Sequence, residues 1–424
     1  RSCKHLMTMQ SLAWILVSVI GAVAWGVLAL HRGESINAAW LVLAAVGTYL
    51  VGYRFYSRFL AAKVLGIDPT RATPAERLSN GRDFVPTTRG VLFGHHFAAI
   101  AGAGPLVGPV LAAQFGYLPG MLWIVFGVVL GGAVQDFVIL FASMRRDGKS
   151  LGQMAKEEVG PVTGLAAMIA ILAIMIILLA VLALVVVNAL RDSPWGMFTI
   201  ACTVPIALLM GFWMKVWRPG RTMEATAVGI VLLMASLVGG RFVAEHASLG
   251  PMFTMGGTTI AWLIIAYGFV ASVLPVWMLL CPRDYLSTFM KVGTIVLLAV
   301  GILVVLPPIK LPALTQFIDG TGPVFAGKLF PFAFITIACG AISGFHALVA
   351  SGTTPKMLRR EGDAPLIGYG GMLTESFVAV MALCAAAVLD PGVYFAINAP
   401  LATLGGSLDA AAETIRGWGF AVTP

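Results

Sequence analysis

Charged side chains are scarce in this sequence. Asp, Glu, Lys and Arg make up 11% of the residues, whereas hydrophobic residues make up 59%. A soluble domain is about 25% charged, and so little polar surface cannot cover so apolar a chain. The apolar runs, such as 165–187, suit helices that cross a bilayer, because they are about 20 residues long and do not alternate as barrel strands do. The sequence therefore predicts an all-α, polytopic membrane protein.

Cysteine is also sparse, and its positions follow no pattern. The five cysteines (Cys3, Cys202, Cys281, Cys339 and Cys384) show neither metal-site spacing nor a disulfide framework. The His-Glu-x-x-His signature of metalloproteases is missing as well. We therefore expect no bound metal and no cofactor, and we interpret the cysteines as small packing residues.

Eleven apolar stretches could span the membrane. They cover roughly residues 11–30, 38–53, 91–113, 118–142, 163–190, 196–214, 224–240, 258–280, 292–306, 331–351 and 367–389. If the N-terminus is cytoplasmic, 21 of the 27 Lys and Arg residues lie in cytoplasmic segments and 6 lie outside, which is the positive-inside pattern. The net charge of +8 thus reports topology and not a nucleic-acid partner. The expected cytoplasmic loops are 54–89, 143–161, 215–223, 281–291 and 352–366, and no Lys or Arg is expected deep in the membrane.

Two carboxyl groups lie inside expected spans, Asp136 in GGAVQDFVILF and Glu375 in GGMLTESFVAV. An ionised carboxylate within hydrocarbon is unfavourable unless it is paired or hydrated, so burial favours the neutral form. Each group is therefore a candidate proton carrier. The alternative is a hydrogen-bonded carboxyl that joins helices.

The third span begins with GHHFAAIAGAGPLVGP, residues 94–109. Neighbouring helical positions point about 100° apart, so His95 and His96 do not readily share one metal ion. They are either hydrogen-bonded imidazoles at a helix start or part of a proton or substrate site. Glycine and proline free backbone groups that lipid cannot satisfy, and such breaks persist only beside protein or a watery cavity. We expect a helix broken between Gly102 and Pro109; the alternative is a continuous helix whose glycines allow close packing.

A second stretch repeats part of this pattern. Residues 94–105 and 344–355 both fit G-x-H-x5-G-x-x-P, by chance or because both mark helix breaks that face one cavity. Pro275 interrupts the eighth span, and two interrupted spans five apart indicate inverted repeats with the binding site at the breaks. The expected substrate-binding residues are His95, His96, Gly102, Ala103, Gly104, Pro105, Gly108, Ser272, Pro275 and His346. The break is expected to approach Ser272–Pro275.

Several longer motifs resemble the carbon starvation protein A (CstA) family. They are GHHFAAIAGAGPLVGPVLAAQ, GAVQDF, RRDGKSLG, VLPVWMLLCPRDYLSTFMK, DGTGPVF, FPFAFITIACGAISGFHALVASGTTPKML and IGYGGMLTES. The resemblance implies a bacterial inner-membrane carrier that takes up peptides, or pyruvate with protons, and it implies the LeuT-type fold. Two extra helices and a loop are then expected in 1–90, a first five-helix repeat in 91–240, and a second in 241–424. Family members continue with further helices, so we expect this second repeat to be incomplete.

The leading hypothesis is a secondary transporter for peptides or small carboxylates, coupled to protons or sodium. Ser351, Thr353 and Thr354 are candidate sodium ligands, because they offer hydroxyl and carbonyl oxygens, which hard cations prefer. One alternative is a membrane-embedded enzyme that uses His96, His346 and a carboxylate; another is a nutrient sensor or channel. The sequence leaves the substrate and the oligomeric state open.

Overall fold

The computed structural model describes residues 35–422, and every named element in this range is helical. The first expected span, 11–30, lies outside the described residues. The helices are α2 (Ala38–Val51), α3 (Pro74–Arg77), α4 (Arg89–Ile100), α5 (Gly104–Ala112), α6 (Tyr117–Gly127), α7 (Ala133–Met144), α8 (Leu151–Glu158), α9 (Pro161–Leu190), α10 (Pro194–Phe212), α11 (Thr222–Glu245), α12 (Leu249–Phe253), α13 (Gly257–Val273), α14 (Leu280–Val305), α15 (Leu329–Thr336), α16 (Ala338–Ala341), α17 (Gly344–Ser351), α18 (Thr354–Met357), α19 (Gly371–Ala387), α20 (Pro391–Asn398) and α21 (Leu408–Gly417).

Seven helical stretches in the described part are long and apolar enough to cross a membrane, and the bent pair α4–α5 makes an eighth. The seven are Ala38–Leu65, Tyr117–Met144, Pro161–Leu190, Pro194–Trp217, Thr222–Glu245, Leu280–Val305 and Glu361–Ala387. The expectation of an all-α, multi-pass membrane protein is thus confirmed. The expected span 258–280 contains the shorter apolar helix α13, which ends at Val273.

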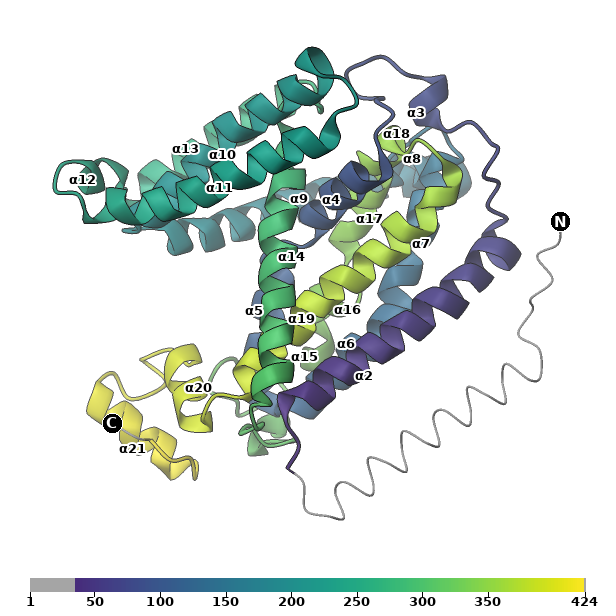
Figure 1. The fold of residues 1–424 in the computed structure, drawn as a ribbon. Coiled ribbons are helices and arrows are strands. Elements are labelled where there is room, and N and C mark those ends of the chain that lie inside the picture. Colours follow the sequence, from purple (N-terminus) through teal and green to yellow (C-terminus); the bar gives the residue numbers. More distant parts are fainter. Residues whose placement is uncertain (1–34, 423–424) are drawn as a thin grey trace.

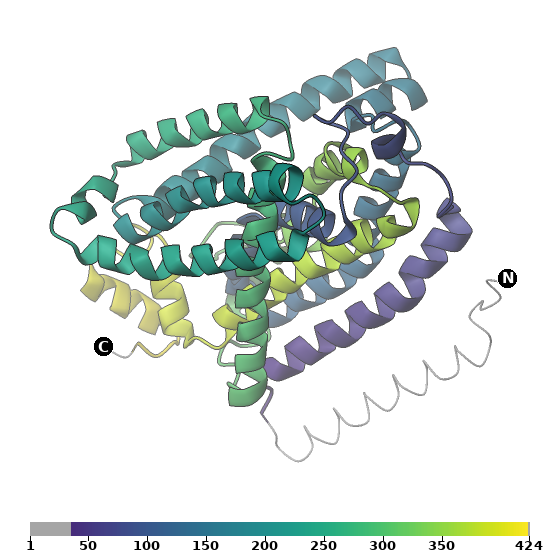
Figure 2. The same ribbon diagram turned by 45° about the horizontal axis from the view of Figure 1, so that its top comes forward.

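The helices form two groups, with α14 crossing between them (Figures 1 and 2). Helices α10, α11 and α13 extend to one side of α14, whereas α2, α6, α7 and α19 run together on the other. The span that ends with α19 has 83% of its apolar window buried, and that of α9 has none buried. We conclude that α19 is the central helix and that α9 faces lipid, since a helix that is apolar all round needs an apolar environment on every side.

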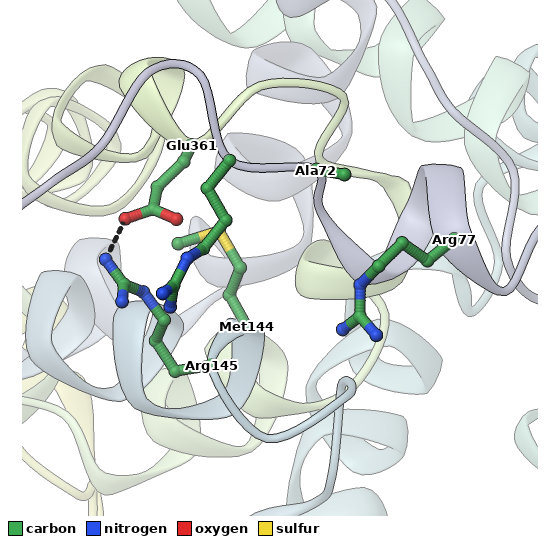
Figure 3. A pocket seen from close by; sticks show the side chains of 6 residues that line it. Ala72, Arg77, Met144, Arg145 and Glu361 are labelled. Atoms are coloured by element: carbon green, nitrogen blue, oxygen red, sulfur yellow. Dashed lines mark hydrogen bonds and ion pairs between the residues drawn. The ribbon is translucent and has the colours of Figure 1, made fainter.

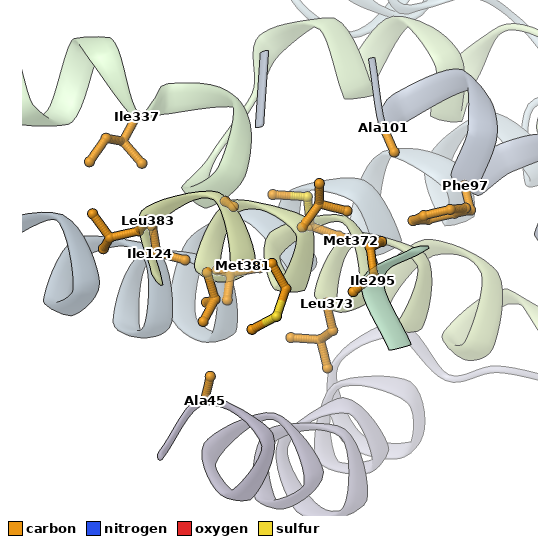
Figure 4. Close-up of a cluster of buried hydrophobic side chains, with 14 of the residues drawn as sticks. Ala45, Phe97, Ala101, Ile124, Ile295, Ile337, Met372, Leu373, Met381 and Leu383 are labelled. Carbon is orange, nitrogen blue, oxygen red and sulfur yellow. The ribbon is translucent and has the colours of Figure 1, made fainter. Parts of the chain in front are cut away.

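The core of the molecule surrounds α19 (Figure 4). Met372, Leu373 and Leu383 on this helix belong to one buried cluster with Ala45 of α2 and Ile124 of α6. Small residues let neighbouring backbones approach, as membrane helices require in the absence of a hydrophobic driving force. This packing fixes the rotation of α19 and hence the direction in which its one carboxyl group points.

The polar connections gather at two opposite ends of the bundle. At one end, backbone bridges join Ala72 to Arg360 and Thr87 to Leu358. At the other, Asn37 pairs with Pro308, and Lys310 Nζ lies 2.9 Å from Asp390 Oδ2. This division agrees with the expected separation of cytoplasmic and outer loops, except that 281–291 is no loop, because α14 begins at Leu280.

The assignment of the first end to the cytoplasm predicts the accessibility of two exposed serines. Ser79 precedes α4 and Ser248 precedes α12, and both side chains are exposed. We expect a membrane-impermeant thiol reagent applied to intact cells to label Ser248→Cys and to spare Ser79→Cys until the cells are permeabilised. The parent protein provides the background labelling of the native cysteines. Labelling in the reverse order would invert the topology.

Candidate functional site

The third expected span is broken, as the sequence predicts. Helix α4 ends at Ile100, α5 begins at Gly104, and the two halves are bent by 44°. The Gly102 N–H donates to the Ile100 carbonyl at 2.9 Å, so it no longer serves the carbonyl four residues earlier. The break lies at the N-terminal edge of the expected range, and the remainder of that range, through Pro109, is helical within α5.

The glycines around the break have different roles. A Cβ on Gly104 would lie 2.7 Å from Sγ of Cys339, and one on Gly108 would collide with the Thr336 carbonyl. These two glycines allow α5 to pack closely against α15 and α16, which is the packing role weighed as the alternative. Gly102 is exposed, and a Cβ there would meet nothing within 4 Å. Gly102 is therefore the glycine beside which a ligand has room.

Lys291 contacts the same break, which corrects the expectation that no Lys or Arg lies deep in the membrane. It is a partly buried residue near the middle of the 26-residue helix α14. Its Nζ donates to the Ala98 carbonyl at 2.9 Å and to the Ala101 carbonyl at 2.7 Å. The expected boundary at 292 was wrong because the polar residues of α14 lower the hydropathy of its first half.

The two candidate proton carriers lie on either side of one histidine. Nδ1 of His346 on α17 is 3.1 Å from Oδ2 of Asp136 on α7, and its Nε2 is 3.9 Å from Oε1 of Glu375 on α19. All three side chains are fully buried. Both carboxyl oxygens of Glu375 and Oδ1 of Asp136 lack a hydrogen-bond partner within residues 35–422. A buried carboxyl group without a partner is less unfavourable in its neutral form than in its ionised form. The cluster of Asp136, His346 and Glu375 can therefore hold a proton.

Cys339 of α16 joins this cluster, although nothing in the sequence pattern predicted it there. Its Sγ lies 3.9 Å from Nε2 of His346, while the opposite ring nitrogen faces Asp136. The ligand atoms of Cys339, His346 and Glu375 all lie within 4.8 Å of one another, so these residues could also hold a metal ion. The separation of seven residues between Cys339 and His346 matches no known metal-binding spacing. Their side chains meet because the chain turns between α16 and α17.

The adjacent histidines of α4 bond to hydroxyl groups. Nδ1 of His96 is 2.9 Å from Oγ1 of Thr354, and Nε2 of His95 is 3.3 Å from Oγ1 of Thr353. The hydroxyl of Ser351 donates to the Ala347 carbonyl at 2.7 Å. All three hydroxyl groups named as candidate sodium ligands thus have protein partners. Both imidazoles are buried and connect α4 to the region of α17 and α18.

The repeated G-x-H motif marks two breaks. The first copy contains the interruption at Gly102, and in the second α17 ends at Ser351 and α18 begins at Thr354, with Gly352 between them. The segment 329–351 is itself interrupted, since it consists of α15, α16 and α17. Helices α17 and α18 both pack against α4. Both copies of the motif therefore coincide with a helix break, and that the two breaks face one cavity stays a prediction.

The expected approach of the break to Ser272 and Pro275 was wrong. Ser272 is exposed and its hydroxyl donates to the Phe269 carbonyl of its own helix. Beyond Pro275, the Val276 N–H donates to the Arg82 carbonyl in the loop before α4. Pro275 ends α13 instead of breaking a span, because the residue before a proline prefers an extended backbone, as Leu274 has here. The second discontinuous segment is 329–351.

A basic cavity of about 370 Å³ opens among the polar connections (Figure 3). It is lined by Arg71, Ala72, Arg77, Met144, Arg145 and Glu361. Arg145 forms an ion pair with the buried Glu361, and Arg77 forms one with Asp147. Hydrogen bonds from the Thr70 side chain and backbone lower the pKa of Asp68 beside this cavity, and nearby arginines add to the effect. Carboxylates thus offset much of the positive charge.

Comparison with known proteins shows which family the chain matches and which relatives it is similar to. Residues 37–424 match the family described as "Carbon starvation protein CstA". The chain is 60% identical over 418 residues to the peptide transporter CstA of Escherichia coli (strain K12), covering 97% of this chain and 60% of that protein. It is 57% identical over 437 residues to the pyruvate/proton symporter BtsT of the same strain, covering 98% and 61%. It thus spans about 60% of the length of these relatives. No solved structure matches.

Proposed function

Because the chain belongs to the carbon starvation protein CstA family, we propose that the protein is a secondary transporter for uptake of peptides or small carboxylates such as pyruvate, coupled to protons. The observation that carries this proposal is the break between α4 and α5, where backbone groups are free inside a membrane-spanning segment. Irregular backbone at this depth is stable only beside protein or a watery cavity. The proposal places the protein in the bacterial inner membrane with a cytoplasmic N-terminus.

The proposed architecture is LeuT-type, with about eleven spans in this chain. Residues 91–240 form the first repeat and 241–424 contribute to the second, while 1–90 supply two additional helices and a loop. This division rests on the family resemblance, because the two discontinuous segments, α4–α5 at the start of the first repeat and α15–α17 inside the second, do not occupy corresponding positions in the two repeats. Helices α5 and α16 pack together, as the two broken helices around a central binding site do.

The proposed coupling ion is the proton, carried by Asp136, His346 and Glu375. The two carboxyl groups are buried on both sides of an imidazole, an arrangement in which a proton can move between neighbouring acceptors. The hydroxyls of Ser351, Thr353 and Thr354 hydrogen-bond to protein groups, and sodium would need lone pairs that these bonds leave free. The relative named as a pyruvate/proton symporter agrees with the choice of the proton.

One observation favours an enzymatic role: the side chains of Cys339, His346 and Asp136 lie in a row. This row resembles a nucleophile, a base and an orienting acid. The Sγ–Nε2 distance of 3.9 Å exceeds a proton-transfer contact, and His346 and Asp136 are fully buried. We therefore propose that the protein moves its substrate without covalent change and is not an enzyme. The same buried cluster argues for a carrier over a sensor or a channel.

Uptake by the reconstituted full-length protein tests the proposal. We expect proteoliposomes to accumulate labelled pyruvate or a labelled dipeptide when the external medium is more acidic than the vesicle interior. The label recovered from the vesicles should be chemically unchanged substrate. Accumulation should disappear when a protonophore collapses the gradient and should persist in sodium-free medium.

Three results would count against this function. Failure to transport both probes would remove the substrate assignment, and accumulation that requires sodium would remove the proton. Recovery of a converted product would favour the enzyme. Empty liposomes provide the baseline, and assays with and without a chelator reveal any metal held by Cys339, His346 and Glu375.

A further inference from the structure

Lys291 has a position that the transport proposal does not yet explain. We propose that its ammonium group binds the carboxylate of the substrate at the break between α4 and α5. The inference rests on the proposed function and adds the group that recognises the substrate's negative charge. It therefore favours ligands with a free carboxylate, such as a 2-oxo acid or the C-terminus of a peptide.

The two carbonyls that Lys291 contacts are among those that the break leaves without backbone donors. The Ala98 carbonyl would normally accept from the N–H of Gly102, which turns instead to Ile100. The Ala101 carbonyl would accept from residue 105, which is proline and has no N–H. The last carbonyls of a helix also carry partial negative charge, which favours a cation. The local sequence thus creates a place for one ammonium group, and α14 supplies it.

Both groups that Lys291 contacts are neutral acceptors, so no acid touches its ammonium group, although Asp284 attracts it from a longer distance. Intramembrane lysines are usually paired with an acid, yet within residues 35–422 Lys291 forms no ion pair. The nearest acid along its own helix, Asp284, has Oδ2 2.9 Å from Nδ1 of His95 and so serves that imidazole. An ammonium group has three donors, and two of them are used. The third donor has no partner among the described residues, and an ammonium group that touches no acid can still bind an anion.

The surroundings offer further donors and room for a ligand. The N–H groups of Ala103 and Gly104 have no acceptor in the described part of the chain, and Gly104 begins the nine-residue helix α5. Gly102, which lies between the end of α4 and these two residues, is exposed. A carboxylate placed here would meet Lys291, two amides and the N-terminal end of α5, all of which favour negative charge. Glycine lets the ligand approach the backbone closely.

The test compares ligands that differ only in charge. Binding of labelled pyruvate to the purified full-length protein is competed with unlabelled pyruvate and with pyruvamide, its neutral amide; a dipeptide and its C-terminal amide form the second pair. In the parent protein we expect the acid to compete far better than the amide. In Lys291→Gln we expect acid affinity to fall roughly 10- to 100-fold and amide affinity to change little, so that the preference disappears. Lys310→Gln, which removes an exposed lysine near the opposite end of the bundle, should keep the preference.

If Lys291 had only a structural role, its replacement would lower the affinities for the acid and the amide equally. An unchanged preference for the acid in Lys291→Gln would overturn the inference. If that variant yields little folded protein, Lys291→Arg retains the charge and should retain the preference; its loss there would also contradict the proposal. If the parent protein binds and transports neither acid, the proposed function itself is wrong. The two failures are therefore distinguishable.

Discussion

Replacing Glu375 with glutamine is expected to abolish proton-driven accumulation while substrate exchange continues. The carboxyl group is fully buried on the central helix α19 and has no hydrogen-bond partner in the described chain. Glutamine preserves its size and polarity but cannot bind and release a proton. A carrier that has lost its proton site can still exchange substrate across the membrane, but it cannot use the gradient.

Asp136→Asn should act in the same direction for a related reason. The asparagine oxygen can still accept from Nδ1 of His346, 3.1 Å away in the parent protein, so the imidazole keeps its orientation. The negative charge that stabilises a protonated imidazole is lost. Asparagine also cannot bind and release a proton, and we expect accumulation to fall with folding retained.

These effects are measured as the ratio of internal to external substrate in proteoliposomes. One coupled proton and a difference of one pH unit support about tenfold accumulation, and we expect a ratio near one in Glu375→Gln. Counterflow without a gradient reports exchange. Glu413→Gln, on the exposed face of α21, is the matched control. Full accumulation in both Glu375→Gln and Asp136→Asn would dismiss the proton assignment.

Valine substitutions at two glycines of one segment should fail in different ways. A Cβ at Gly108 collides with the Thr336 carbonyl, a backbone atom that cannot move aside by a change of rotamer. Gly108→Val therefore separates α5 from α15, and overpacking of this kind costs about 1–3 kcal/mol or more. We expect little monodisperse protein after detergent extraction and a lower thermal midpoint.

Gly102→Val should leave the fold intact and remove substrate binding. A Cβ at this position meets no atom within 4 Å, so valine fits without moving a neighbour. Its side chain occupies the space in which a carboxylate would approach Lys291 and the free amides. The affinity for labelled pyruvate and dipeptide should fall at least tenfold, while the amount and thermal midpoint of the protein match the parent.

The two outcomes separate packing from binding. Gly104→Val is unsuitable for this purpose, because its Cβ would press on Cys339 and disturb both. Normal affinity in Gly102→Val would show that the break is not where the substrate binds. Normal yield in Gly108→Val would show that α5 and α15 are less tightly packed than the structure indicates.

The sequence alone determined the features that arise locally. Runs of about 20 apolar residues produce membrane helices because each backbone group must find its partner within the segment. The cluster of glycine and proline at 102–109 predicted the break, since proline removes a donor and glycine weakens the helix. The repeat of the G-x-H motif pointed to the second break at Gly352. The distribution of Lys and Arg predicted which connections share an end of the bundle.

Only the tertiary structure decided which distant groups meet. Asp136, His346 and Glu375 come from three helices whose packing rotates each side chain toward the others, and no spacing in the sequence encodes that rotation. Cys339 joins them for the same reason. Pro275 was mistaken for a break within a span because a single proline looks the same in the middle of a helix and at its end. The depth of Lys291 was missed because hydropathy counts it as polar, whereas the carbonyls freed on α4 make its place in the membrane favourable.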